Sequence, residues 1–248
     1  MNDAELLRYS RHIMLPDIDV AGQEALRAAH VLVVGLGGLG CPAALYLAAA
    51  GIGTLTLVDH DRVELSNLQR QIAHATTDID MPKAESAAES VRAINPGVDV
   101  RARVEKLDAH NCESLVQAAD LVVDASDNYS IRFVLNQACV RLRKPLISAA
   151  AIRGEAQVAL FNATPTSPCY RCLYDDSVDD DNLSCAHSGV VAPLVGIVGA
   201  MQALEALKAI VGFGTSLDGY LLTFDAMQME WHKLRLRKNP SCACCGSG

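Results

Sequence analysis

Short segments rich in Val, Leu and Ile recur along the chain, separated by longer segments in which apolar positions return every three or four residues. The short segments predict strands at 30–34, 54–59, 98–104, 121–124 and 146–149. The longer segments predict helices over 41–50, 81–94 and 129–142. Strands that alternate with helices are typical of an α/β fold with a Rossmann-like, doubly wound, mostly parallel sheet.

The two ends of the chain are patterned differently from this core. Residues 1–29 predict two short helices. Their apolar faces would be formed by Leu6, Leu7, Ile13, Met14 and Leu26. Toward the C-terminus, 156–161 and 220–234 predict antiparallel strands. The uncharged stretch 188–204 falls short of the roughly 20 apolar residues that a membrane span needs, so we expect a buried helix there.

Composition narrows the class of protein further. The 248 residues fit one large α/β domain, and 50% of them are hydrophobic, which excludes a disordered chain. A net charge of −8 argues against nucleic acid as a partner. The N-terminal segment has no long apolar core before a cleavage site, so we expect no signal peptide, no membrane and a location in the cytoplasm.

The nine cysteines fit metal binding better than disulfides, because their number is odd and no secretion signal accompanies them. Cys169 and Cys172 form one CxxC pair, and Cys242 and Cys245 form a second. Four thiolates are the ligand set of a structural, tetrahedral zinc site. Cys244 lies inside the second pair and is an alternative ligand. The remaining cysteines in apolar or helical surroundings are expected to be packing residues: Cys41, Cys112 and Cys139.

A glycine-rich turn follows the first predicted strand. Gly35, Gly37, Gly38 and Gly40 match the pattern G-x-G-x-x-G between a strand and a helix, and Asp59 ends the next strand. Glycines let the backbone approach phosphates, and the carboxylate can accept hydrogen bonds from a ribose. The pattern predicts a nucleotide site but does not choose between a dinucleotide and ATP. The alternative is a tight turn that only packs a helix on the sheet.

Polar residues at the carboxyl ends of the other strands favour ATP. They are Ser66, Asn67, Leu68, Gln69, Arg70 and Gln71 in one segment, Lys83 at a helix start, and Asp127 and Asn128 beyond the strand 121–124. A triphosphate must be neutralised before an anionic nucleophile approaches it, and amides and cations do this. Alternatively, Arg70 and Lys83 are ordinary solvated charges.

Several motifs together resemble one family. RYSRHIML, VLVVGLGGLG, SNLQRQ, DMPKAES, DASDN, CYRCL, GVVAPLVGIVGAMQALEALK and the closing CxxC are similar to the MoeB/ThiF family of adenylating enzymes, in order and over nearly the whole chain. The resemblance implies a homodimer that uses ATP to adenylate the C-terminal Gly-Gly carboxylate of a small ubiquitin-like sulfur-carrier protein, releasing pyrophosphate.

The resemblance also implies roles for individual residues. Gly38 and Asp59 would contact the nucleotide, and Asp127 would organise Mg²⁺ and the triphosphate. The side chains around the phosphates would be those of Asn67, Gln69, Arg70 and Lys83. The four cysteines of the two CxxC pairs would hold Zn²⁺.

Two further residues have roles only by this resemblance. Arg11 matches an arginine that reaches the ATP site of the other subunit; by helical periodicity alone it is a solvated side chain. Cys185 matches a cysteine that some members link covalently to the carrier; alternatively it is an unreactive loop cysteine. His187 either lowers the pKa of that thiol or faces solvent.

The order of the predicted elements gives the domain organisation. We expect one ATP-binding domain over 1–248, made of N-terminal helices over 1–29, a nucleotide-binding core over 30–165 and a zinc-bound, carrier-binding part over 166–248. The acidic, polar segment 174–187 predicts a mobile loop.

Both the pathway and the class of protein have alternatives at this point. By resemblance, the segment from Ala150 to Arg153 and the following strand favour a carrier of molybdopterin synthesis, whereas the N-terminal segment favours a carrier of thiamine thiazole synthesis. A silent binding module and a nicotinamide-dependent oxidoreductase are the rival classes. The binding module is disfavoured by a complete set of charged residues: Arg11, Asp59, Arg70, Lys83 and Asp127. The oxidoreductase is supported only by the glycine motif.

Overall fold

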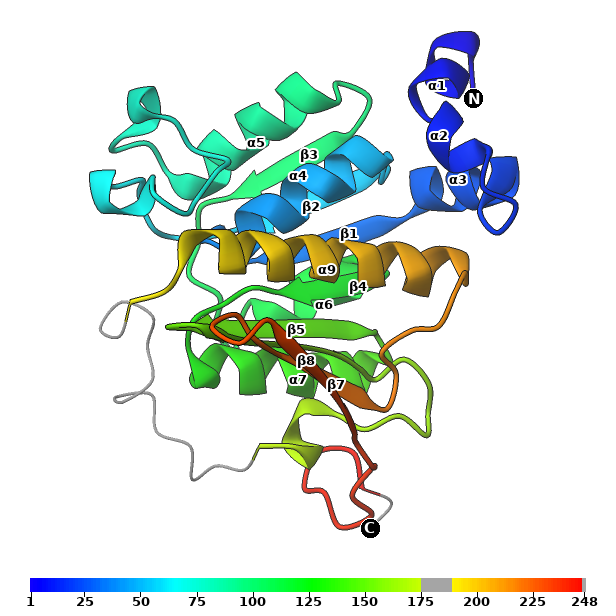
Figure 1. The fold of residues 1–248 in the computed structure, drawn as a ribbon, viewed down its shortest axis with the longest axis vertical. Coiled ribbons are helices and arrows are strands. Elements are labelled where there is room, and N and C mark those ends of the chain that lie inside the picture. The colour runs from blue at the N-terminus through cyan, green and yellow to red at the C-terminus, as the bar shows by residue number, and fades with distance from the viewer. Residues whose placement is uncertain (175–188, 247–248) are drawn as a thin grey trace.

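The computed structural model describes residues 1–174 and 189–246 and contains one eight-stranded sheet (Figure 1). The strands stand in the order β3-β2-β1-β4-β5-β6-β7-β8. Their bounds are β1 His30–Val34, β2 Thr54–Val58, β3 Asp99–Arg103, β4 Leu121–Asp124, β5 Leu146–Ile152, β6 Glu155–Phe161, β7 Tyr220–Asp225 and β8 Glu230–Arg235.

The first five strands of the sequence pair in parallel, and the last three add to the sheet in antiparallel fashion. The chain runs outward from β1 to β3, then returns to place β4 on the other side of β1. Loops leave β1 and β4 in opposite directions at this reversal, which opens a crevice at the carboxyl ends of these strands. The predicted fold class is therefore confirmed.

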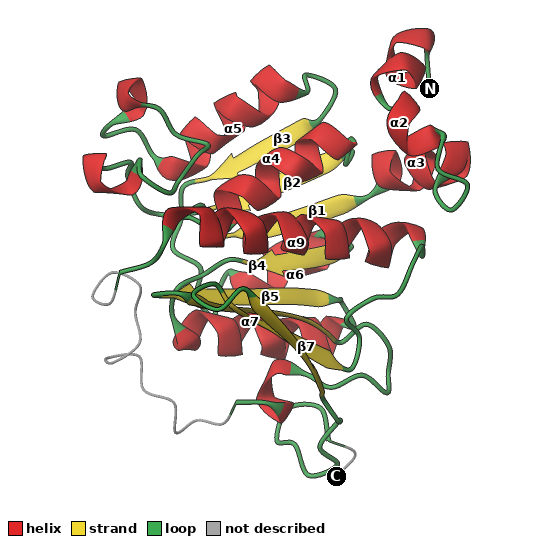
Figure 2. Ribbon diagram, in the orientation of Figure 1, coloured by secondary structure: helices red, strands yellow, loops and turns green. Residues whose placement is uncertain are grey.

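Helices cover both faces of the sheet (Figures 1 and 2). On one face, Val31 and Val33 of β1 pack with three helices: α4 Gly40–Ala50, α5 Lys83–Ile94 and α9 Ala192–Val211. On the other face, Leu32 and Val34 pack with α6 Cys112–Ala118 and α7 Tyr129–Leu142. Successive side chains of a strand point to opposite faces, so a strand buried on both sides is apolar throughout.

The N-terminal segment forms three short helices, α1 Asp3–Arg8, α2 Ser10–Ile13 and α3 Asp19–Ala28, where the sequence predicted two. Leu26 is fully buried, but Leu7 is 77% and Met14 69% exposed. The prediction that Leu7 and Met14 lie on apolar faces packed against the core of this chain is therefore wrong. The helices α1 and α2 have only six and four residues, and neither contains a buried residue.

Helix α9 is longer than the uncharged stretch suggested. It runs for 20 residues, with a mean hydropathy of 1.7 over an 18-residue window, and is long and apolar enough to cross a membrane by length and composition. Half of that window is buried. The helix packs on α4, β5 and β6, which is the position of a core helix, as the sequence predicted.

Most other elements lie within a few residues of their predicted bounds. Strand β5 continues through Ile152, beyond the predicted end at Ala149, and α6 occupies a stretch for which the sequence pattern predicted no element. Short 3-10 helices cover Leu65–Asn67, Thr76–Asp78 and Tyr170–Cys172. All but the first residue of the predicted mobile loop over 174–187 lies outside the described residues.

Candidate nucleotide site and cysteine cluster

A cleft of about 800 Å³ opens at the carboxyl ends of β1, β2 and β4. Its walls come from the turn after β1, the segment after β2, the start of α5 and the loop after β4. The predicted site residues that line it are Gly35, Gly37, Gly38, Asp59, Asn67, Arg70, Lys83, Asp127 and Asn128. Segments far apart in the sequence are thus brought together as the strand order requires.

The glycines of the turn are required by space as well as by conformation. Gly35 has a φ of +86°, and a Cβ there would lie 2.7 Å from the carbonyl oxygen of Ala125. A Cβ on Gly40 would lie 1.8 Å from the Gly35 carbonyl oxygen. The turn therefore presses against the loop after β4 and leads directly into α4, whose N-terminal N–H groups form an anion site.

Asp59 holds this turn through its carboxylate. One oxygen accepts a hydrogen bond from the Leu36 N–H at 2.7 Å, and the other accepts one from the Asp61 N–H at 2.8 Å. The carboxylate therefore links the end of β2 to the glycine turn after β1.

The cations that line the cleft include two predicted site residues, Lys83 and Arg70. Lys83, 7% exposed, places its Nζ 2.9 Å from a carboxylate oxygen of Asp61. Partial burial alone would raise the pKa of Asp61, but the hydrogen bond and charge of Lys83 lower it below its usual value. Arg70 donates to the Ser66 carbonyl oxygen at 3.1 Å. Both cations are thus held in place without a ligand.

A further amide side chain of the cleft is that of Gln71, a residue of the predicted polar segment to which no role was given. It is 3% exposed, and its Oε1 is buried without a hydrogen-bond partner among the described residues. An unsatisfied buried polar atom at a cleft wall fits a missing ligand. Ser66, Leu68 and Gln69 do not line the cleft. The amides of the segment 66–71 indicated that an amide side chain would line the cleft, but the sequence did not show which of them does so.

The loop after β4 is fixed by a buried ion pair that the sequence analysis missed. Asp124 is fully buried and accepts from the hydroxyls of Ser126 at 2.6 Å and Ser148 at 2.7 Å. Its carboxylate lies 3.9 Å from Nε of Arg132, whose Nη2 donates to the Ser126 carbonyl oxygen at 2.7 Å. The pair thereby sets the path of the loop that carries Asp127.

Two predicted residues lie elsewhere. Arg11 is exposed on α2, with Nη1 3.8 Å from the Met14 sulfur, and does not line this chain's cleft. Cys185 and His187 lie outside the described residues.

The cleft continues from the nucleotide side toward the antiparallel strands. Small and apolar residues of β5 and β6, among them Ala150, Ala151 and Ala156, form its wall there. Thr223, Asp225 and His232 of the β7–β8 hairpin line its far end. The polar side chains of Glu155 and Gln157 also line this extension.

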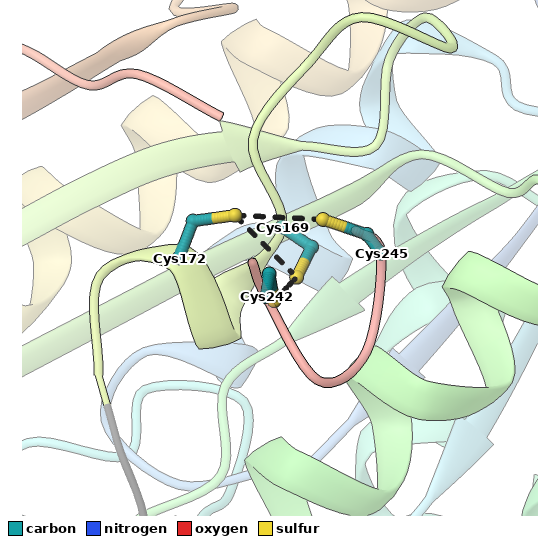
Figure 3. Close-up of side chains that lie close together, drawn as sticks. All are labelled: Cys169, Cys172, Cys242 and Cys245. Carbon is teal, nitrogen blue, oxygen red and sulfur yellow. Dashed lines mark hydrogen bonds between the residues drawn. The ribbon is translucent and has the colours of Figure 1, made fainter. Parts of the chain in front are cut away.

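The four cysteines of the two CxxC pairs gather at one point, as Figure 3 shows. The Sγ atoms of Cys169 and Cys242 lie 3.6 Å apart, those of Cys172 and Cys169 3.9 Å, and those of Cys172 and Cys245 3.4 Å. Tetrahedral zinc with Zn–S bonds of about 2.3 Å requires S···S separations of about 3.8 Å. The donor set could therefore hold zinc.

Cys244 lies beside this group, because its N–H donates to the Cys242 Sγ at 3.5 Å. The Sγ of Cys244 accepts from Nδ2 of Asn136 at 3.4 Å, which ties the C-terminal pair to α7. Burial raises the pKa of Cys41 and of Cys112 to about 12, and raises that of Cys139 as well. These three thiols behave as the packing residues that the sequence predicted.

Together, the glycine turn, the cations and the cysteine cluster define a nucleotide-binding α/β protein with a four-thiolate centre. The ThiF family model matches residues 9–244, and the chain belongs to that family. The resemblance to this family noted in the sequence is therefore confirmed.

Similar proteins carry related names. Over 246 residues, the chain is 44% identical to the molybdopterin-synthase adenylyltransferase of Escherichia coli, covering 99% of this chain and 98% of that protein. It is equally identical, 44%, to the sulfur carrier protein ThiS adenylyltransferase of E. coli, covering 99% and 97%. The crystal structure of E. coli MccB with ATP has a TM-score of 0.87 and 25% identity, covering 99% of this chain and 75% of that one.

The buried pair beneath the β4 loop predicts a large effect on stability. Replacing Asp124 by Ala leaves the Arg132 guanidinium buried without its counter-charge, which costs about 3 kcal/mol or more in the free energy of unfolding. Urea denaturation measures this. The control is Asp120→Ala at the exposed start of β4, where one hydrogen bond to the His30 N–H is lost and the cost is about 1 kcal/mol. Equal losses in the two variants would contradict the assignment.

Proposed function

We propose that this chain is an ATP-dependent adenylyltransferase acting on the C-terminal Gly-Gly carboxylate of a small ubiquitin-like sulfur-carrier protein. The observation that carries the proposal is one cleft that joins a phosphate-type site to an extension walled in part by small residues of β5 and β6. The names of two relatives, both adenylyltransferases, support the reaction class. The last two glycines of such a carrier have no side chains, so they fit beside the small residues of this wall.

The reaction requires positioning rather than a general base. A C-terminal carboxylate has a pKa near 3.5 and is ionised at pH 7. One of its oxygens forms a bond to the α-phosphorus, the bond from that phosphorus to the bridging oxygen breaks, and pyrophosphate leaves with the electron pair. The acyl-adenylate is the product. The chain must offset repulsion between two anions and align them.

Different residues of the cleft bind different parts of the ATP molecule. The N–H groups of the glycine turn, Gly38 included, bind phosphate oxygens, and Asp59 accepts from the ribose. Arg70, Lys83, Asn67 and Gln71 neutralise or bind the triphosphate. Ser66, Leu68 and Gln69 support that segment from outside the cleft, and Asn128 lies beside Asp127.

Asp127 fits the role of a Mg²⁺ ligand. Its exposed carboxylate lines the cleft and has no hydrogen-bond or ion-pair partner among the described residues. Carboxylate oxygens and phosphates are the ligands that Mg²⁺ takes. When bound, the ion would neutralise charge on the departing pyrophosphate, and Asp127 would hold it against the phosphates.

The pathway that we favour is molybdopterin synthesis, as the sequence indicated. The second candidate is the thiamine-pathway carrier, because the chain is as similar to the ThiS adenylyltransferase as to the molybdopterin-synthase enzyme. Exchange rates measured with each carrier separate these two. A cytoplasmic location, the single domain with its three parts, and the covalent role of Cys185 remain predictions.

Carrier-dependent exchange of pyrophosphate into ATP tests the function. We expect exchange with a carrier ending in Gly-Gly and none with the same carrier lacking its last glycine. Arg70→Ala and Lys83→Ala should each reduce exchange about a hundredfold or more, on the order of 3 kcal/mol of transition-state stabilisation. Arg101→Ala is the control, since Arg101 is exposed on β3 and paired with Asp99 outside the cleft. Near-normal exchange by folded Arg70→Ala protein would refute its assignment.

We also propose that the cysteine cluster holds one Zn²⁺ per chain, with a structural role because four thiolates leave no open position. Cys169→Ser should lose the metal and lower the unfolding temperature by roughly 5 °C or more, since metal binding adds to folding free energy. Elemental analysis and thermal unfolding measure the two effects. The neighbouring Cys244→Ser is the control and should keep the metal. Protein purified without chelator but free of zinc would disprove the site.

The same geometry supports a homodimer. Arg11 lies outside its own cleft, and the exposed apolar side chains of Leu7, Met14 and Leu15 surround its helix. A second subunit would cover these side chains and receive the guanidinium. An arginine supplied in trans neutralises phosphate charge only in the assembled dimer.

Subunit mixing tests this role of Arg11. Arg11→Ala and Arg70→Ala proteins should each be inactive alone. After exchange of subunits, one site of each heterodimer has both wild-type arginines, so part of the pyrophosphate exchange should return. Subunits that demonstrably exchange without recovery of activity would show that Arg11 does not act across the interface.

A further inference from the structure

The peptide that follows Leu36 in the glycine turn is held from two sides. The Leu36 N–H donates to Asp59, as described above, and the Leu36 carbonyl oxygen faces the core. There it lies 3.1 Å from Nε2 of His74 and 3.2 Å from the Cys41 thiol. His74 is 8% exposed, and the reaction proposed above assigns it no task.

The direction of this carbonyl decides where the next N–H points. In a trans peptide, the C=O of one residue and the N–H of the next point in opposite directions. Because the Leu36 carbonyl is directed toward His74, the Gly37 N–H is directed away from the core. Gly37 lines the cleft, and its N–H has no acceptor among the described residues. A Cβ added to Gly37 would meet only Gln71 Nε2, at 3.7 Å, so the space is open.

We propose that His74 is a positioning residue for the nucleotide, because its hydrogen bond to the Leu36 carbonyl aims the Gly37 N–H at a phosphate oxygen. The inference rests on the proposed function. A free N–H at a helix start binds an anion strongly only when it is oriented before the ligand arrives.

The other side of the ring connects this turn to helix α5. Nδ1 of His74 lies 2.8 Å from the Ser86 hydroxyl, which lies 2.8 Å from a carboxylate oxygen of Asp78. The first residue of the same helix is Lys83. His74 therefore fixes the distance between the backbone donors of the turn and the buried cation, the two groups that would meet the triphosphate.

The ring is suited to donate one proton to Leu36. Burial lowers the pKa of His74 and the charge of Lys83 lowers it further, although the Leu36 carbonyl, Asp59 and Asp78 act in the opposite direction. The thiol of Cys41, 3.6 Å from Nε2, has a pKa of about 12 and stays protonated. A proton on Nε2 satisfies the Leu36 carbonyl, and the Ser86 hydroxyl donates its own proton to the Asp78 carboxylate, so that the Ser86 oxygen faces Nδ1.

Nucleotide affinity of the intact protein tests the proposal. His74→Phe keeps a ring of similar size but removes the donor, and we expect it to raise the KM for ATP and the Kd of a non-hydrolysable ATP analogue about tenfold. The KM for the carrier should change less than about twofold. His74→Gln, whose amide N–H can reach the same carbonyl, should recover most of the affinity. If His74→Phe fails to fold, the shorter His74→Asn replaces it, with the same loss expected.

The matched control is His30, a half-buried histidine whose Nε2 lies 2.8 Å from the Thr56 hydroxyl at the opposite end of β1. His30→Phe should lower the unfolding temperature but leave the affinity for ATP unchanged. An affinity of His74→Phe within about twofold of wild type would overturn the proposal, as would equal losses in the His30 and His74 variants. Wild-type protein that binds the analogue but shows no carrier-dependent exchange would overturn the proposed function instead.

Discussion

The contact between the glycine turn after β1 and the loop after β4 is the constraint on which the site depends. Gly35 leaves no room for a side chain against Ala125, so the two strand ends meet backbone to backbone. The sheet order places these loops side by side, and the buried Asp124–Arg132 pair fixes one of them. A bulkier residue in the turn would separate the walls of the cleft and misplace every donor on them.

Charge in the cleft is arranged before any ligand is present. The chain has a net charge of −8, yet Lys83 and Arg70 are held at the cleft by Asp61 and by a backbone carbonyl. A triphosphate that displaces Asp61 exchanges one anionic partner of Lys83 for another, so the lysine need not be reoriented. Such preorganisation lowers the cost of gathering charge around a transition state.

Local patterns in the sequence predicted much of this architecture. The strands β1, β2, β4 and β5 are largely apolar because both faces are buried, and the glycine turn and the CxxC pairs are short-range motifs with a direct physical meaning. The failures are long-range. Nothing local distinguishes Gln71 from Gln69, since only the packing of the segment after β2 decides which amide faces the cleft. Arg132 and His74 act by hydrogen bonds to residues distant in sequence, which no local pattern reveals. Leu7 and Met14 are exposed although they follow an apolar pattern, which a second chain covering them would explain.

The zinc that we propose for the two cysteine pairs would bind at a particular stage in the folding of the chain. Cys169 and Cys242 lie 73 positions apart, with α9, β7 and β8 between them, so the ligand set is complete only after these elements have docked on the sheet. Closing so long a loop costs entropy, which earlier contacts must already have reduced. The parallel core from β1 to β5 has no such dependence and can form first. Metal capture would then be a late event that stabilises a finished fold, and a chain deprived of metal would fail at its C-terminal end before its nucleotide cleft.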